Sequence, residues 1–193
     1  MRIKKALVLF FVLMFSNCCF ASPEELSKQA TAFYSDNNFE KTIELLLQIM
    51  PENRTAQDWL ILGNLLDEKG EKEQALFMYQ KALEVDSKYY KACYNRGNIY
   101  MEQGKYTEAI ENYNKAAKIN ATNPYVYYNL ACAYLKRGKT KEAKNALLKA
   151  VTIKNDIPEI HYNLAYVYQK LNKPKLAQTY LDNYNKLTEN YFQ

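Results

Sequence analysis

A period of 34 residues runs through most of this sequence and limits the folds that it can adopt. A small residue recurs at this interval at Ala75, Ala109, Ala143 and Ala177. Two further series keep the same interval: Gly63, Gly97, Ala131 and Ala165, and Gly70, Gly104, Gly138 and Asn172. A fixed period of this length indicates a repeat protein, in which each unit buries its apolar face against the next unit.

The pattern within one period predicts two helices joined by a tight turn. If the units begin at residues 56, 90, 124 and 158, their positions 4, 7, 8 and 11 hold large and small apolar residues. These four positions share one arc of a helix of about 3.6 residues per turn. In one copy these are Tyr127, Leu130, Ala131 and Tyr134. The glycine series stands where the first helix must end in a left-handed residue, and Asn172 is the best substitute for glycine there.

This pattern resembles the tetratricopeptide repeat, whose opening signature is matched by Trp-Leu-Ile-Leu-Gly at 59–63. Ala75 with Tyr79 matches the signature of the second helix. The four copies run over 56–89, 90–123, 124–157 and 158–191, and 22–55 is identified as a degenerate or capping copy with Thr42 at its small position. The resemblance implies an all-α, right-handed superhelical solenoid of antiparallel helix pairs, with four clear repeats and one degenerate N-terminal repeat.

The first 21 residues predict a secretory signal peptide. Three basic residues precede an apolar run over 6–15, and small and polar residues follow up to Ala21. The run is too short to span a bilayer, which takes about 20 residues. Two alternatives are open: a lipoprotein signal with Cys18 or Cys19 acylated, and an uncleaved anchor. The protein is therefore expected to be exported, either periplasmic or secreted, or lipid-anchored in the envelope.

Charge and cysteine content exclude several functions. The formal net charge is +5, and the predicted signal peptide accounts for three of the basic residues, so no nucleic-acid partner is expected. Only Cys93, Cys132 and His161 remain as soft ligands, so no metal site is predicted. Cys93 falls at a packing position and Cys132 on the opposite arc of the next copy. Both should be free thiols, because their offset of five repeat positions along neighbouring helices is about 7.5 Å, in addition to the spacing between the helices. A disulfide needs α-carbons within about 7 Å. His161 is expected to pack, since Tyr127 holds the same position one copy earlier.

The first helices of such a solenoid line its concave face. Their outward arc holds Tyr94, Tyr128 and Tyr162 at position 5 and Asn95, Asn129 and Asn163 at position 6, which we call the asparagine stripe. A carboxamide can donate to and accept from an extended peptide backbone, and tyrosine adds contact area at low entropic cost. The predicted partner-binding groove is therefore Lys91, Tyr94, Asn95, Asn98, Tyr128, Asn129, Tyr162 and Asn163. The same arc holds Leu60 and Ile61 in the first copy, and Tyr125 and Glu159 at position 2.

Two readings of the asparagine stripe are open. It resembles the asparagine ladder that binds peptide backbone in the tetratricopeptide superhelix of O-linked N-acetylglucosamine transferases, although their catalytic domain has no counterpart here. Alternatively, these residues only solvate the helix surface. A clamp for a C-terminal carboxylate is disfavoured, because no arginine lies on the groove arc. Arg96 replaces a leucine at a packing position, so we expect it to reach solvent or pair locally.

No phosphate loop, nucleophile elbow or metal-binding helix motif is present, so no catalytic residue and no cofactor are predicted. The leading hypothesis is a non-enzymatic scaffold or adaptor in the periplasm or cell envelope, which binds a peptide or helix of a partner protein in its concave groove. The alternative is a structural subunit of an envelope assembly, or a homo-oligomer, that acts through its C-terminal helix. That helix carries an apolar stripe with no following helix to cover it: Leu176, Tyr180, Leu181, Tyr184 and Leu187.

Overall fold

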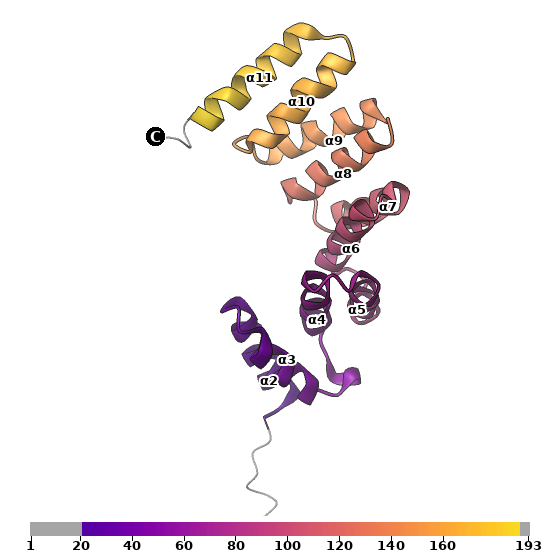
Figure 1. Ribbon diagram of the computed structural model, residues 1–193, viewed down its shortest axis with the longest axis vertical. Helices are drawn as coiled ribbons and strands as arrows, with labels where there is room; N and C mark the ends of the chain where they lie inside the picture. The colour runs from indigo at the N-terminus through magenta and orange to yellow at the C-terminus, as the bar shows by residue number, and fades with distance from the viewer. Residues whose placement is uncertain (1–20, 190–193) are drawn as a thin grey trace, which may run out of the picture.

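The computed structural model describes residues 21–189, which form ten α-helices, one short 3-10 helix and no strand. The helices are α2 (Pro23–Ser35), α3 (Phe39–Gln48), η1 (Pro51–Asn53), α4 (Ala56–Glu68), α5 (Lys72–Val85), α6 (Tyr90–Glu102), α7 (Tyr106–Ile119), α8 (Pro124–Lys136), α9 (Thr140–Ile153), α10 (Pro158–Lys170) and α11 (Pro174–Glu189). Figure 1 shows them as successive antiparallel pairs along a curved stack. The all-α solenoid of helix pairs is therefore confirmed.

The predicted signal peptide, with Cys18 and Cys19, lies outside the described residues except for Ala21. None of the helices within 21–189 combines the length and the apolar character that a membrane crossing requires.

The turns inside the helix pairs follow the prediction. Gly70, Gly104 and Gly138 have positive φ, and Asn172 takes the same left-handed conformation at φ 55°. Asn37, at φ 58°, makes the equivalent turn between α2 and α3. The period did not predict this turn, because Asn37 lies 33 residues before Gly70 and so falls outside the 34-residue series. An asparagine in the left-handed region is the expected substitute for glycine at a helix end.

The small residues of the period set how closely the two helices of a pair approach. A Cβ atom on Gly97 would lie 2.5 Å from Cε1 of Tyr113, which projects from α7 onto α6. Gly63 meets the ring of Tyr79 in the same way one repeat earlier. In the next repeat Ala131 faces α9, whose corresponding residue is the smaller Leu147, and both are buried in one cluster. Glycine with tyrosine and alanine with leucine are thus two ways of filling the same space.

The N-terminal helix pair packs on α4 and changes one expectation. Ile61 is fully buried in a cluster with Leu26, Leu46 and Ile49. Leu60 is also buried, against residues of α5 and α6. The expectation that Leu60 and Ile61 line the groove is therefore wrong, because the degenerate pair and the next repeat cover this part of α4.

A buried carboxylate joins the same two units. Asp58 is fully buried and forms a capping box with Thr55 at the start of α4. Its second carboxylate oxygen accepts a 2.7 Å hydrogen bond from the Ser27 hydroxyl of α2. One side chain therefore both begins α4 and ties α2 to it, which is how a polar group can be buried without losing its hydrogen bonds.

The remaining core expectations hold. Cys93 is buried and Cys132 half-buried, and both are free thiols. His161 is buried, with Nε2 2.7 Å from the carbonyl oxygen of Asn155. Arg96 is half-buried and donates a 2.7 Å hydrogen bond to Oε1 of Gln80, which confirms local pairing.

Candidate functional site

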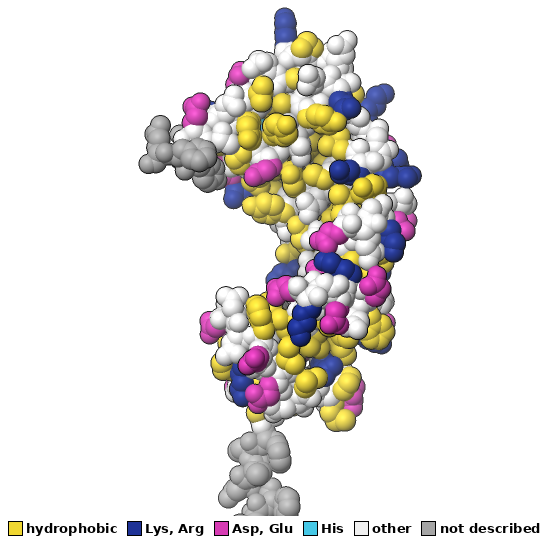
Figure 2. Space-filling model, in the orientation of Figure 1, with side chains coloured by type: hydrophobic (Ala, Val, Ile, Leu, Met, Phe, Trp, Pro, Cys, Tyr) yellow, Lys and Arg dark blue, Asp and Glu magenta, His cyan; other side chains and the backbone are white. Residues whose placement is uncertain are grey.

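The first helices of the repeats form the inner side of the curved stack. Figure 1 shows α4 and α6 on the inside of the arc, with α5 and α7 outside. Figure 2 shows the surface hollowed on this side, between the N-terminal pair and the C-terminal pair. This inner surface is the concave face on which the predicted groove residues lie.

Along the middle of the concave face, the asparagine stripe connects neighbouring helices. Asn95 Nδ2 donates to Asn64 Oδ1 at 2.7 Å, from α6 to α4. Asn129 Nδ2 donates to Asn98 Oδ1 at 3.1 Å and to the Tyr94 hydroxyl at 2.9 Å, from α8 to α6. Both asparagines therefore place their donor groups in bonds between repeats.

Two buried tyrosines complete this network from the second helices. The Tyr79 hydroxyl donates to Asn64 Oδ1 at 2.9 Å, and the Tyr113 hydroxyl donates to Asn98 Oδ1 at 2.8 Å. Burial raises the pKa of both tyrosines far above the ordinary value, so both hydroxyls stay protonated and act as donors. Each of these carbonyl oxygens thus accepts two hydrogen bonds, as its two lone pairs allow.

The hydrogen bonds between repeats become fewer and weaker toward the C-terminus. Within residues 21–189, the one acceptor of Asn163 Nδ2 is the sulfur of Cys132, at 3.7 Å. Sulfur is a weak acceptor, so this contact contributes less than the amide bonds of the earlier repeats. Leu147 and Leu181 replace the buried tyrosines in these two repeats, so the hydroxyl donor of Tyr79 and Tyr113 has no counterpart at this position of α9 and α11.

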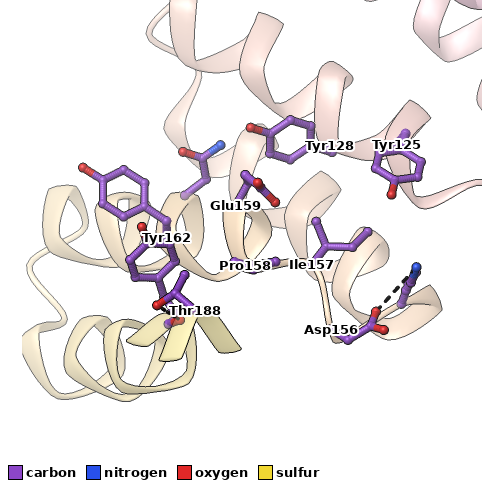
Figure 3. Close-up of a pocket in the computed structure, with 11 residues that line it drawn as sticks. Tyr125, Tyr128, Asp156, Ile157, Pro158, Glu159, Tyr162 and Thr188 are labelled. Carbon is purple, nitrogen blue, oxygen red and sulfur yellow. Dashed lines mark hydrogen bonds and ion pairs between the residues drawn. The ribbon is translucent and has the colours of Figure 1, made fainter. Parts of the chain in front are cut away.

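A hollow of about 880 Å³ opens in this C-terminal half. It lies where the first turns of α8 and α10 meet the end of α11, and Figure 3 shows the side chains that surround it. The lining residues are Tyr125, Tyr128, Lys154, Asp156, Ile157, Pro158, Glu159, Tyr162, Asn163, Tyr184 and Thr188. We call this hollow the tyrosine pocket.

Local structure fixes the walls of the tyrosine pocket. Proline stands at the first position of both α8 and α10, and the Asn123 side chain caps α8 by accepting from Tyr125 N. The tyrosine rings of the first two turns therefore project from well-defined helix starts. At 16 residues, α11 is longer than α5, α7 and α9, which have 14 each, and its last turns carry Tyr184 and Thr188 to the pocket.

The four tyrosines of the pocket differ in exposure. Tyr162 and Tyr125 are 54% and 48% exposed, whereas Tyr128 is half-buried. Burial raises the pKa of Tyr128 to about 12. The ring centroids of Tyr162 and Tyr184 are 5.4 Å apart in a tilted arrangement. The pocket therefore offers uncharged aromatic surface, some of it facing solvent.

The predicted groove residues fall into three groups. Tyr128, Tyr162 and Asn163 line the tyrosine pocket. Tyr94, Asn95, Asn98 and Asn129 belong to the hydrogen-bonded network between repeats. Lys91 is exposed near the start of α6. Contact of these residues with a partner stays a prediction.

Sequence reasoning missed the contribution of α11 to the pocket. Tyr184 was assigned to an apolar stripe of the last helix and not to the groove. One pattern pointed to it: the alanine series Ala82, Ala116 and Ala150 breaks at Tyr184, where a large ring replaces the small residue. Tyr125 and Glu159 were placed on the groove arc correctly, and both line the pocket.

The last helix presents a second surface. None of its residues is buried, whereas α5, α7 and α9 each bury at least three. Leu176 is 42% exposed, and a smaller hollow of about 360 Å³ between α10 and α11 is lined partly by Tyr166 and Leu181. The end of the solenoid is thus more apolar than a polar cap would be.

Within residues 21–189, no group of three histidine, cysteine, aspartate or glutamate side chains lies close enough together to hold a metal ion.

Comparison with known proteins follows the repeat register. Models described as "TPR repeat" and "Tetratricopeptide repeat" match residues 97–138, 132–172, 78–111, 59–89 and 158–191. No curated protein matches the sequence. Among solved structures, the chain is similar to a double mutant of MamA of RS-1 (TM-score 0.76, 16% identity, covering 88% of this chain and 96% of that one). It is also similar to MamA of AMB-1 (0.73, 19%, 86% and 92%) and to PilF of Pseudomonas aeruginosa (0.73, 23%, 85% and 75%). At these identities the likeness concerns the fold.

Proposed function

Since the chain belongs to the tetratricopeptide-repeat family, whose repeats form scaffolds for protein–protein interaction, we propose that it is a non-enzymatic adaptor that holds a partner protein on its concave face. The partner contributes an extended peptide or a helix. We place the adaptor on the outer side of the inner membrane, in the periplasm or attached to the cell envelope.

The tyrosine pocket carries this proposal. At about 880 Å³ it has about twice the volume of the hollow of about 440 Å³ between α7, α8 and α9, and it lies on the concave face. Tyrosines are enriched where proteins bind one another, because one ring supplies much contact area with few rotatable bonds. Tyr125 and Tyr162 have this character, whereas the neighbouring repeats keep their polar groups bonded to each other.

Export is supported by the sequence of the first 21 residues, with its basic start, short apolar run and small residues before Ala21. Fractionation of the source cell, with the N-terminus of the mature chain determined by mass spectrometry, tests this part. Cleavage after Ala21 favours the free exported form, and an acylated Cys18 or Cys19 favours the lipoprotein. A full-length N-terminus in the cytosolic fraction contradicts export.

The adaptor role is tested by photo-crosslinking in the living source cell. A benzophenone amino acid replaces Tyr162 in one variant and Phe77 in another. Phe77 is a matched control, because it is 56% exposed and lies on α5 at the outside of the arc. We expect adducts of defined mass from position 162 and none from position 77. Equal labelling at both positions, or none at position 162, argues against the concave face.

A second function is favoured by the absence of buried residues in α11. In this alternative, the exposed end of the solenoid joins a structural assembly or a second copy of the chain through Leu176 and its neighbours. Sedimentation velocity over a wide concentration range tests self-association, with Leu176→Gln as the comparison. A monomer at every concentration contradicts the homo-oligomer, and a concentration-dependent dimer that Leu176→Gln abolishes supports it.

A further inference from the structure

The tyrosine pocket combines aromatic walls with a carboxylate that has no partner within the chain. Glu159 projects from the first turn of α10 and lies between Tyr128 and Tyr162 in Figure 3. Within residues 21–189 it makes no side-chain hydrogen bond and no ion pair. At the rim, Lys154 Nζ lies 3.8 Å from Asp156 Oδ1, so these two charges offset each other. The pocket therefore carries a net negative charge in a chain whose formal net charge is +5.

The aromatic walls suit a positive charge for a second reason. A tyrosine ring attracts a cation placed over its face, because the ring has a negative electrostatic surface. The high pKa of Tyr128 keeps that ring neutral, so it offers this face without a phenolate. Rings from three helices converge here, namely Tyr125 and Tyr128 from α8, Tyr162 from α10 and Tyr184 from α11.

The polar groups of the pocket also suit a donor more than an acceptor. Asn163 uses its Nδ2 on Cys132, and its Oδ1 makes no hydrogen bond within the described residues. Glu159 and Asn163 therefore both present acceptor oxygens. A helix start attracts anions, but Pro158 has no N–H to offer, and the Glu159 carboxylate already supplies a negative charge to this turn.

We propose that the tyrosine pocket binds the ammonium or guanidinium group of a lysine or arginine side chain in an extended segment of the partner protein. This inference rests on the proposed function, since it assumes that the concave face holds a partner. The cation pairs with Glu159 and lies against the exposed face of Tyr162, which follows Glu159 by three residues on α10. The partner's backbone runs along the neighbouring helix starts.

The test uses four synthetic peptides of sequence acetyl-Gly-Ser-Ala-X-Ala-Ser-Gly-amide, with X as arginine, lysine, glutamine or glutamate. Each is titrated into the purified protein, and binding is followed by the amide chemical shifts of Glu159 and Tyr162 in nitrogen-15 NMR spectra. We expect the arginine and lysine peptides to bind about two- to fivefold more tightly than the glutamine peptide, the range for an exposed ion pair with a cation–π contact. High salt should reduce this preference.

Two variants locate the effect. Glu159→Gln keeps the shape and should abolish the preference for arginine and lysine over glutamine. Tyr162→Leu should weaken the arginine peptide about two- to fivefold. Glu111→Gln is the matched control, because Glu111 is an exposed glutamate on α7 outside the pocket, and it should leave every affinity unchanged.

Three results overturn the inference: equal affinity for the arginine and glutamine peptides, tighter binding of the glutamate peptide than of the arginine peptide, and no effect of Glu159→Gln on the charge preference. The inference is also wrong if no peptide changes the amide chemical shifts at 10 mM, on the order of the dissociation constant of a very weak single contact. Failure here and failure of the proposed function are distinguishable. Crosslinking from position 162 without charge preference leaves the adaptor intact and removes the cationic ligand. Charge-selective peptide binding without crosslinks in the cell retains the pocket chemistry and removes the proposed adaptor role.

Discussion

The fit between Gly97 and Tyr113 makes a sharp prediction about the packing of a repeat. In Gly97→Ala, the added Cβ would lie 2.5 Å from Cε1 of the tyrosine, about 1 Å inside ordinary van der Waals contact. The ring is 1% exposed, and its hydroxyl is held by Asn98 at 2.8 Å. It therefore has no free space to enter, and moving it breaks a hydrogen bond.

The expected cost follows from three opposing contributions. Overpacking a dense core costs about 1–3 kcal/mol, and weakening the tyrosine–asparagine bond adds about 0.5–1.5 kcal/mol. Alanine in place of glycine inside a helix recovers about 1 kcal/mol. The net destabilisation is therefore about 0.5–3.5 kcal/mol. For a domain of this size, at about 2–4 °C per kcal/mol, that lowers the midpoint of thermal unfolding by about 1–14 °C.

The assay is thermal and urea unfolding followed by circular dichroism, with hydrogen exchange of α6 and α7 because a repeat array can open in parts. Tyr113→Leu combined with Gly97→Ala recreates the alanine–leucine pair of the third repeat, Ala131 with Leu147. We expect the double variant to be more stable than the sum of the single changes by about 1 kcal/mol or more. Ala131→Gly, the control, should cost about 1 kcal/mol without any coupling of this kind.

Two outcomes would refute the reasoning. Gly97→Ala at or above the stability of the unaltered protein would mean that the ring adjusts without cost. Additive effects in the double variant would mean that the clash is not with Tyr113.

Three further predictions concern polar groups. Asn129→Ala should destabilise the protein by about 1–2 kcal/mol, because it removes two hydrogen bonds between α8 and α6. Asn163→Ala removes one contact to sulfur and should cost less than about 0.5 kcal/mol, so equal costs in urea unfolding would contradict this. Asp58→Ala should cost about 2 kcal/mol and make the segment before α4 cleave faster in limited proteolysis, and unchanged cleavage would count against the tie to α2. Asn172→Gly should be neutral or stabilise by up to about 1 kcal/mol, while Asn172→Ala should destabilise by about 1 kcal/mol, with reversed signs disproving left-handed strain.

The sequence was enough to predict the asparagine stripe on the concave face, but not its hydrogen bonds. Position 6 can be read from the period, since it lies on the arc opposite the packing positions. The hydrogen-bond partner of Asn95 is Asn64, 31 residues earlier. This sequence separation differs from the 34-residue period because it depends on how neighbouring helices are offset. The partners therefore required coordinates.

The core assignments show the same limit. Cys93 and His161 were predicted as packing residues because they share a repeat position with large apolar residues. Ile61 was misassigned because the period alone does not show that the degenerate pair packs over α4, and Leu60 because it is covered by residues of α5 and α6. A helical wheel describes one helix and its ideal neighbours, and an irregular neighbour changes which arc is covered.

The sequence by itself determined the architecture of this protein, because a 34-residue period with small residues at the positions of the tetratricopeptide repeat predicts a stack of antiparallel helix pairs. It also determined that the turns at Gly70, Gly104, Gly138 and Asn172 are left-handed. Only the tertiary structure decided where a pocket opens. That depends on the last turns of α11, which carry Tyr184 and Thr188 beside residues of α8 and α10. Local patterns follow from the chain's own geometry, whereas a pocket is the space left between surfaces that are distant in sequence.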